Sequence, residues 1–350
     1  LGSDTNWMMP NGTWAYSYGK SQNVNPNLGW EEKKEWNLGV DYSFFEGRLY
    51  GKFDYYRREV DNLLFSEKVP QPPYTQGSQM QNIGSMESKG WEFEVGGDII
   101  RTKDFTWSSS MNLSHNTGKI LTLEGDNSYH NGNGFVAPGT PGDAARMEAG
   151  STIGSFYMWK FAGFDDEGSF LLYNKDGEVI PAAQKTENDK QYIGNYTPKL
   201  IIGWSHTLTY KNFDLGINLR SWIDFDVYNT INMYYGIQGQ GNLNVLKDAY
   251  GKFNHIKGEK QICDYFLEDG TFLKIDAITL GYTRPMKKYT NNLIDRIRIY
   301  GTVGNVCTIT GYSGMNPEVD ITGWDKGTEK FWSDFYPVVR TWTLGMQFNF

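Results

Sequence analysis

Cysteine, histidine and long apolar runs are all scarce in this sequence. Its 350 residues include two cysteines, Cys263 and Cys307, and four scattered histidines. The cysteines fit no metal-binding spacing, so we expect no zinc site. No run of eighteen apolar residues occurs, which excludes a transmembrane helix. A membrane β-barrel stays open, because only every second residue of a barrel strand is apolar.

Positive charge is also limited. The chain has 33 Lys and Arg residues against 41 Asp and Glu, and it contains no basic run or stripe, which argues against binding of nucleic acid. It begins with Leu1 and has no signal peptide, so we expect a processed or truncated piece of a longer protein. No linker or change in composition divides it, which predicts one architectural unit over residues 1–350.

Amphipathic strands run through the whole chain. In the last of them Val338, Trp342, Leu344, Met346, Phe348 and Phe350 share one face, and Val339, Thr341, Thr343, Gly345, Gln347 and Asn349 share the other. This period of two is typical of a strand with one apolar face. The same alternation predicts nine strands, at residues 35–42, 49–58, 91–99, 105–114, 200–210, 213–220, 272–282, 296–303 and 338–350.

The connections between these strands alternate in length. Short turns follow residues 44, 100, 210 and 284, and long loops cover roughly residues 59–82, 117–197, 223–270 and 308–336. A strand of ten residues that is tilted by roughly 40° rises about 25 Å, the height of the apolar band of an outer-membrane barrel. The pattern therefore predicts an all-β fold, a partial transmembrane antiparallel β-barrel with its short turns in the periplasm and its long loops outside the cell.

A soluble β-sandwich or propeller is the alternative, since the same alternation would place apolar residues in a core. The asymmetry of the loops and the charges on the polar face of the strands weigh against it.

Two details depart from regular strands. The apolar register shifts between Ile275 and Ile278, which predicts a bulge, and residues 156–164 with 169–173 are expected to form an extracellular hairpin within the long fourth loop.

Further expectations follow from this arrangement. Arg340 should lie at the outer rim beside lipopolysaccharide phosphates, because a lipid-facing arginine at mid-membrane depth is costly. The seventh and eighth strands are expected to form a hairpin with its turn near residue 290, which places Cys307 roughly opposite residue 273. Cys263 and Cys307 are expected to stay separate; a disulfide formed by a loop that folds back is the alternative. The strands at 35–42 and 338–350 should pair with strands outside these residues, because an open edge in lipid leaves backbone groups unsatisfied. Ten side chains are expected to face lipid: Trp36, Val40, Phe53, Phe93, Val95, Trp107, Leu215, Ile217, Leu344 and Phe348.

Two loops carry aromatic and amide side chains of the kind that bind sugars or peptides. The first covers residues 228–242 and the second 128–135. Functional contacts concentrate on loops that a rigid scaffold carries, although packing against neighbouring loops would explain the same composition. The residues predicted to contact a ligand or an extracellular lid are Tyr228, Asn232, Tyr234, Tyr235, Gln238, Gln240, Asn242, Tyr129 and Asn131.

The sequence gives little support for a metal site or for catalysis. Asp165, Asp166, Asn174 and Asp176 form a loose calcium motif that lacks the full spacing, and an ordinary hairpin turn is the alternative. Glu92 and Glu94 share one strand face, but nothing supplies the opposed carboxylates that a glycosidase requires. We therefore expect no enzymatic activity and no cofactor other than the candidate calcium.

Several motifs resemble those of SusC/RagA-type TonB-dependent outer-membrane transporters, and they occur in the family's order along nearly the whole chain. They lie at residues 25–31 (Asn-Pro-Asn-Leu-Gly-Trp-Glu), 36–42, 82–86 (Asn-Ile-Gly-Ser-Met), 89–92, 193–198, 210–215, 268–273 (Glu-Asp-Gly-Thr-Phe-Leu), 280–282 and 310–318 (Thr-Gly-Tyr-Ser-Gly-Met-Asn-Pro-Glu). The family imports nutrients across the outer membrane of bacteria of the Bacteroidota.

The resemblance implies a barrel of about 22 strands with a plugged lumen, of which this chain is the carboxy-terminal part. The plug, the TonB-binding segment and the earlier strands would lie outside it. It also implies a SusD-like lipoprotein that caps the barrel, and TonB as the partner that energises import of a glycan or a peptide. A passive porin or a structural barrel protein is the other class of function, and a plug and TonB-binding segment upstream would distinguish the two.

Overall fold

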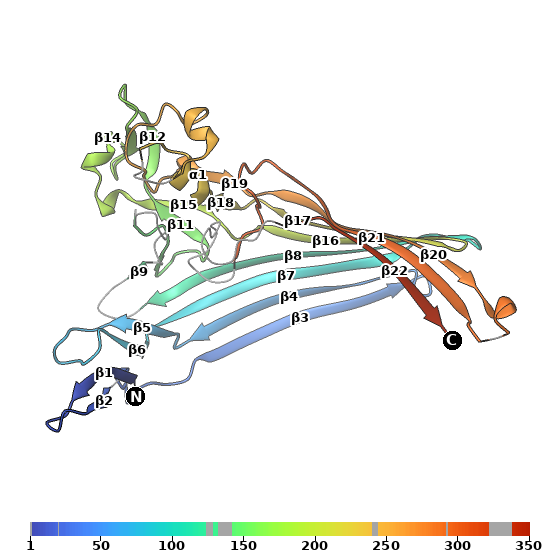
Figure 1. Ribbon diagram of the computed structural model, residues 1–350, viewed down its shortest axis with the longest axis horizontal. Helices are drawn as coiled ribbons and strands as arrows, with labels where there is room; N and C mark the ends of the chain where they lie inside the picture. The colour runs from blue at the N-terminus through green and yellow to red at the C-terminus, as the bar shows by residue number, and fades with distance from the viewer. Residues whose placement is uncertain are drawn as a thin grey trace.

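A curved nine-stranded antiparallel sheet is the largest structural unit of the protein (Figure 1). The computed structural model describes residues 2–19, 21–123, 129–131, 142–239, 244–291, 293–321 and 338–350. The strands follow the order β22-β21-β20-β17-β16-β8-β7-β4-β3, and every neighbouring pair is antiparallel. Their bounds are β3 Glu32–Phe44, β4 Leu49–Asp61, β7 Gly84–Arg101, β8 Phe105–Leu123, β16 Leu200–Tyr210, β17 Phe213–Ile223, β20 Phe272–Pro285, β21 Arg296–Thr310 and β22 Thr341–Asn349.

All nine predicted strands are confirmed, but most are longer than expected. β7 has 18 residues and β8 has 19. Residues 84–90 carry polar side chains on both faces, so they lack the apolar alternation from which the prediction was made. Backbone pairing continues there nonetheless, from Gly84↔Leu123 onward, because ladder hydrogen bonds do not require an apolar face.

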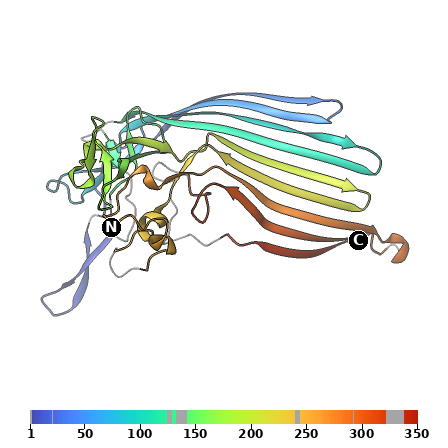
Figure 2. The same ribbon diagram turned by 90° about the horizontal axis from the view of Figure 1, so that it is seen from above.

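The connections have the predicted asymmetry. Figure 2 shows the short turns of β3–β4, β7–β8, β16–β17 and β20–β21 at one end of the sheet and the large loops at the other. The β3–β4 turn is tight because Phe45, Glu46 and Gly47 all have positive φ angles, of 56°, 55° and 83°. We call the two ends of the sheet the short-turn end and the long-loop end.

Register places apolar residues on one face of the sheet and polar residues on the other. Across the strands Val40 pairs with Phe53, Phe53 with Phe93, and Phe93 with Leu113. The neighbouring row, Asp41, Lys52, Glu94 and Asn112, is polar. All ten residues predicted to face lipid lie in rows of the apolar face. We call this the outward face and the other the inward face.

The predicted bulge in β20 is confirmed at Asp276. Ala277 pairs with Asn218 and Ile275 with Leu219, so Asp276 is the extra residue. In a bulge two residues oppose one partner, and here the extra residue keeps both Ile275 and Ile278 on the outward face. Cys307 consequently pairs with Ile275, two residues from the position that a turn at residue 290 predicts.

A lobe formed by residues 142–199, 225–239 and 244–271 lies at the long-loop end (Figure 1). Its strands are β10 Arg146–Glu148, β11 Ser155–Met158, β12 Lys160–Phe164, β13 Phe170–Tyr173, β14 Val179–Pro181, β15 Gln191–Asn195, β18 Asp226–Tyr228 and β19 Leu267–Asp269. Its helices are α1 Thr230–Tyr235 and the 3₁₀ turns Ala182–Gln184, Glu187–Asp189, Lys247–Tyr250 and Asp264–Phe266. Outside the lobe lie β1 Gly2–Met8, β2 Trp14–Gly19, β5 Leu64–Lys68, β6 Ser78–Asn82, β9 Tyr129–Asn131 and the turn Lys287–Tyr289.

The hairpin expected at 156–164 and 169–173 is only partly correct. β12 and β13 form it, from Lys160↔Tyr173 to Phe164↔Phe170. Residues 155–158 belong instead to β11, which pairs with the distant β15. The hairpin was assigned from local alternation, which cannot detect a pairing across more than thirty residues.

The main hydrophobic core lies in the lobe and not in the sheet. Phe156, Met158, Phe170, Tyr196 and Phe266 are among its fully buried side chains. The outward face of the sheet remains exposed, with Leu344 83 % and Trp342 76 % accessible. No helix in the described part of the chain is long and apolar enough to cross a membrane.

The strands β3 and β22 are the two edges of the sheet, and in the described residues they do not pair with each other. These described residues therefore form neither a small closed barrel nor a face-to-face sandwich. β22 begins at Thr341 rather than at residue 338, because Asn305 on β21 adopts a left-handed conformation (φ 52°) where the pairing stops. Arg340 lies at the long-loop end, where its guanidinium donates to the carbonyl of Val306. Its depth in the membrane stays a prediction.

Candidate functional site

The inward face is a wall of paired polar side chains. Arg298 donates to both carboxylate oxygens of Asp214, at 3.0 and 2.6 Å. The hydroxyls of Thr279 and Thr302 lie 2.9 Å apart, and the Lys52 ammonium nitrogen lies 3.8 Å from a carboxylate oxygen of Glu94. The threonine pair and the Lys52–Glu94 pair join neighbouring strands, and the Asp214–Arg298 pair reaches across β20 from β17 to β21. A face that water reaches can therefore carry these charges as pairs. Such a face suits the lining of an aqueous or plugged lumen.

One loop is fixed to this wall by a cluster of charges. Glu318, in the loop that follows β21, lies 3.1 Å from Lys274 Nζ and also forms an ion pair with Arg220. Arg220 in turn binds Asp276, the bulged residue of β20, at 2.9 Å. The side chain of Lys274 is only 5 % exposed. We call these four residues the Glu318 cluster.

A second set of hydrogen bonds joins the same loop to the lobe. The Ser313 amide and hydroxyl both donate to the Glu268 carboxylate, at 2.8 and 2.7 Å. The side-chain amides of Asn229 and Asn232 each donate to the Ser313 hydroxyl at 3.2 Å. The motifs at 268–273 and 310–318 thus meet in space. The sequence showed both motifs, but it could not show that they contact each other.

The lobe buries much of the predicted contact loop at 228–242. Tyr228 is fully buried, and Asn232 and Tyr234 are nearly so. Burial raises the pKa of both tyrosines above the ordinary range. These three side chains are therefore not presented on the surface: Tyr228 ends β18, and Asn232 and Tyr234 lie on the short helix α1, which packs into the core. The signal for it was Asn229, whose side chain caps the helix by accepting from the Asn232 amide at 2.9 Å.

The other predicted contact residues have different positions. Tyr235 is half-buried, and the Gln238 amide donates to Ala249 and Asn254 of the lobe. Tyr129 is partly exposed, with Arg146 3.9 Å above its ring. Asn131 pairs with Arg146 through the backbone of β9 and β10, and its side chain lies outside the described part. Gln240 and Asn242 also lie outside the described residues. Contact of these residues with a ligand or lid stays a prediction.

The calcium candidates form two ordinary turns. Asp165 accepts from the Ser169 amide at 2.6 Å, and Asn174 accepts from the amides of Asp176 and Glu178 at 3.0 and 2.8 Å. Asp166 precedes the tight turn at Gly168. Among the described residues no group of three or more His, Cys, Asp or Glu side chains could hold a metal ion. The structure therefore does not bring Asp165, Asp166, Asn174 and Asp176 together as a site.

The two cysteines are separate, as expected: Cys263 is buried in the lobe, and Cys307 is exposed on β21. Burial raises the pKa of the Cys263 thiol to about 12, so the reactive thiolate is scarce at pH 8. In the full-length receptor in detergent, N-ethylmaleimide should modify Cys307 and leave Cys263 unmodified until the protein is denatured. Peptide mass spectrometry checks this, and modification of Cys263 in the folded receptor, or a peptide linked through both cysteines, would contradict it.

Aromatic side chains mark both ends of the outward face. Phe44, Tyr210, Phe213 and Phe350 are exposed at the short-turn end. Trp36 on β3 and Trp342 at the start of β22 are exposed toward the long-loop end. Two aromatic girdles that flank an apolar band are typical of barrels in the outer membrane. Fold and surface together define the class of the protein, the wall of a transmembrane β-barrel.

Comparison with known proteins narrows this class. The model of the family described as TonB dependent receptor-like, beta-barrel matches residues 3–229. The TonB-dependent receptor SusC of Bacteroides thetaiotaomicron is 31 % identical in an alignment of 357 positions, and this alignment covers 97 % of this chain and 34 % of SusC. TonB-dependent receptor P3 of Formosa agariphila is 29 % identical over 353 residues, which cover 93 % of this chain and 35 % of P3. The chain thus spans about a third of the length of these relatives.

The fold agrees with a solved structure. The structure of the RagAB peptide transporter superposes with a TM-score of 0.76 at 24 % identity, covering 98 % of this chain and 38 % of that one. The chain belongs to the TonB-dependent receptor β-barrel family, is of the SusC/RagA type, and forms part of a barrel in the outer membrane.

Proposed function

We propose that the chain forms part of the barrel wall of an importer that takes up a nutrient across the outer membrane with energy from TonB. The observation that carries this proposal is the combination of an apolar outward face, a polar inward face and a folded lobe above it, in a chain of the TonB-dependent receptor family. The polar pairs of the inward face suit a water-filled path, and no chemical step is proposed for them.

The proposal includes two partners. A plug, a TonB-binding segment and further barrel strands belong to the full-length receptor outside residues 1–350. A SusD-like surface lipoprotein covers the lobe, where the exposed residues Tyr192 and Tyr250 can contact it or the nutrient, as can Tyr129 on the adjoining strand β9. The nutrient is a glycan or a peptide. This chain is similar both to SusC and to the RagAB peptide transporter, so the similarity does not decide between the two classes of nutrient.

Uptake in a deletion strain tests this function. We expect the full-length receptor to restore growth on one class of a panel of oligosaccharides and oligopeptides, and the receptor without its TonB-binding segment to fail. The matched control is the amount of receptor in the outer membrane, measured by immunoblot, which should be equal for the full-length and the shortened receptor. Growth that survives removal of the segment would favour a passive porin instead.

The lid is tested separately. An affinity tag placed in the exposed turn Lys287–Tyr289, at the opposite end of the sheet from the lobe, avoids both the surface that the lid covers and the carboxy-terminal strand. Purification of the tagged receptor should yield a lipid-anchored surface protein in stoichiometric amount. Recovery of the receptor alone under conditions that preserve uptake activity would contradict the lid.

A further inference from the structure

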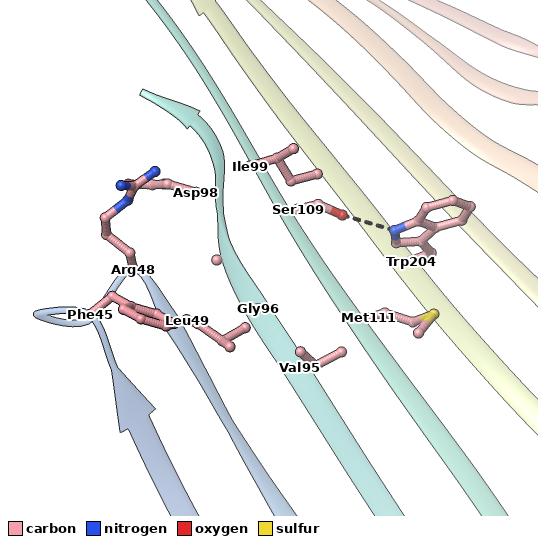
Figure 3. Close-up of a pocket in the computed structure, with 11 residues that line it drawn as sticks. Phe45, Arg48, Leu49, Val95, Gly96, Asp98, Ile99, Ser109, Met111 and Trp204 are labelled. Atoms are coloured by element: carbon pink, nitrogen blue, oxygen red, sulfur yellow. Dashed lines mark hydrogen bonds between the residues drawn. The ribbon is translucent and has the colours of Figure 1, made fainter. Parts of the chain in front are cut away.

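An open groove lies on the outward face near the short-turn end of the sheet (Figure 3). Its volume is about 570 Å³, and strands β4, β7, β8 and β16 line it together with the turn before β4. Two small residues, Gly97 and Ser109, pair with each other across β7 and β8 and form its floor. Larger apolar side chains, such as those of Phe45, Met111 and Trp204, form its walls.

The groove faces the membrane and not the lumen. Its residues Val95, Met111 and Trp204 are register partners on the outward face. A bulge adds to the wall, because Ile99 has no partner between the pairs Asp98↔Ser108 and Ile100↔Trp107. In a bulge two residues oppose one partner, so Ile99 and Ile100 both turn toward the outward face, where both are exposed.

The interior of the groove is apolar. The indole of Trp204 donates to the Ser109 hydroxyl at 2.9 Å, the hydrogen bond drawn in Figure 3. These two polar groups therefore satisfy each other, and the walls around them are formed by apolar side chains such as Val95, Ile99 and Met111. The charged lining residues, Arg48 and Asp98, lie beside the short turn. Such a groove in the wall of a membrane barrel is complementary to an acyl chain.

A single cation lies at the end of the groove beside the short turn. Arg48 lines the groove, and its guanidinium makes no hydrogen bond or ion pair with the rest of the described chain. The nearby Asp98 is already engaged, since it accepts from Ser108 Oγ at 2.6 Å and lies 3.5 Å from Arg101. Arg48 is therefore open to an anion at the depth where the short turns meet the membrane surface.

We propose that this groove is a binding site for one membrane glycerophospholipid, whose acyl chain lies over Gly97 and Ser109 and whose phosphate binds Arg48. The short-turn end is the periplasmic end of the barrel, where the leaflet consists of glycerophospholipids. A guanidinium binds phosphate oxygens through two parallel hydrogen bonds, and its apolar stem can lie along the groove. The site does not depend on which nutrient the receptor imports.

Native mass spectrometry of the full-length receptor in detergent with added phosphatidylglycerol tests this site. We expect the wild-type receptor to retain one phosphatidylglycerol. Arg48→Gln removes the phosphate contact and should weaken retention about tenfold, the size of a lost charge-assisted hydrogen bond. Ser109→Phe fills the groove and should abolish retention.

Matched variants keep the test specific. Arg284→Gln removes another arginine of the outward face at the same end, one that lies over the Tyr289 ring. Gly301→Phe adds a ring to the outward face away from the groove, where an added Cβ meets no atom closer than 3.9 Å. Both should retain lipid as the wild type does. Equal loss in Arg284→Gln and Arg48→Gln, or diacylglycerol retained as strongly as phosphatidylglycerol, would overturn the proposal.

Discussion

Replacing Ile217 with arginine should destabilise the full-length receptor in lipid vesicles by about 2 to 4 kcal/mol. Ile217 lies in the middle of β17, and its row continues across the outward face through Ile278 and Val303. An arginine there would be placed in hydrocarbon, away from either aromatic girdle. Urea-induced unfolding, followed by loss of the heat-resistant folded band on a gel, measures the change.

The adjacent residue provides the control. Asn218 points to the inward face, where its side chain is exposed and accepts one hydrogen bond from Ser205 at 3.0 Å. Asn218→Arg should change the stability by less than about 1 kcal/mol, because the new charge remains in the polar lumen. If the two variants are destabilised equally, the assignment of the two faces is wrong.

Replacing Glu318 with alanine should open the loop of residues 311–321. The change removes the partner of Lys274, whose side chain is 5 % exposed, and leaves that ammonium 4.0 Å from Asp276. A buried charge that loses its partner costs several kcal/mol. Because Arg220 is partly exposed and screened by water, we expect about 2 to 3 kcal/mol for the loop as a whole. Hydrogen exchange of the loop amides in the full-length receptor measures this opening.

The Asp214–Arg298 pair offers a matched comparison. It lies on the same inward face, with both side chains about a quarter exposed, and it holds no loop. Asp214→Asn should leave the exchange of residues 311–321 unchanged. Unchanged exchange in Glu318→Ala would show that the contacts of Ser313 with Glu268 hold the loop without the Glu318 cluster.

The sheet was predictable from the sequence because its signal is local. Residues 213, 215, 217 and 219 face lipid and carry apolar side chains, while residues 214, 218 and 220 face the lumen and carry polar ones. Even the bulge at Asp276 left a local trace, a shift of the apolar register. Strand ends were less predictable where both faces are polar, as at residues 84–90.

The lobe and the anchored loop could not be predicted in the same way. β11 pairs with β15, and the core that buries Tyr228 and Tyr234 collects side chains from segments far apart in sequence. An aromatic loop rich in amides and glycine has the same composition whether it packs inward or projects outward. The contacts of Glu318 with Arg220 span 98 residues, and no period in the sequence indicates them.

The most direct test of the barrel-wall account is spin labelling along β17 of the full-length receptor in phospholipid vesicles. Single labels at residues 214 to 219 report their accessibility to oxygen, which concentrates in lipid, and to a water-soluble nickel complex. The account predicts high oxygen accessibility at Leu215, Ile217 and Leu219 and low oxygen accessibility at Asp214, Gly216 and Asn218. Accessibility without a period of two, or a higher oxygen value at Asn218 than at Ile217, would contradict it.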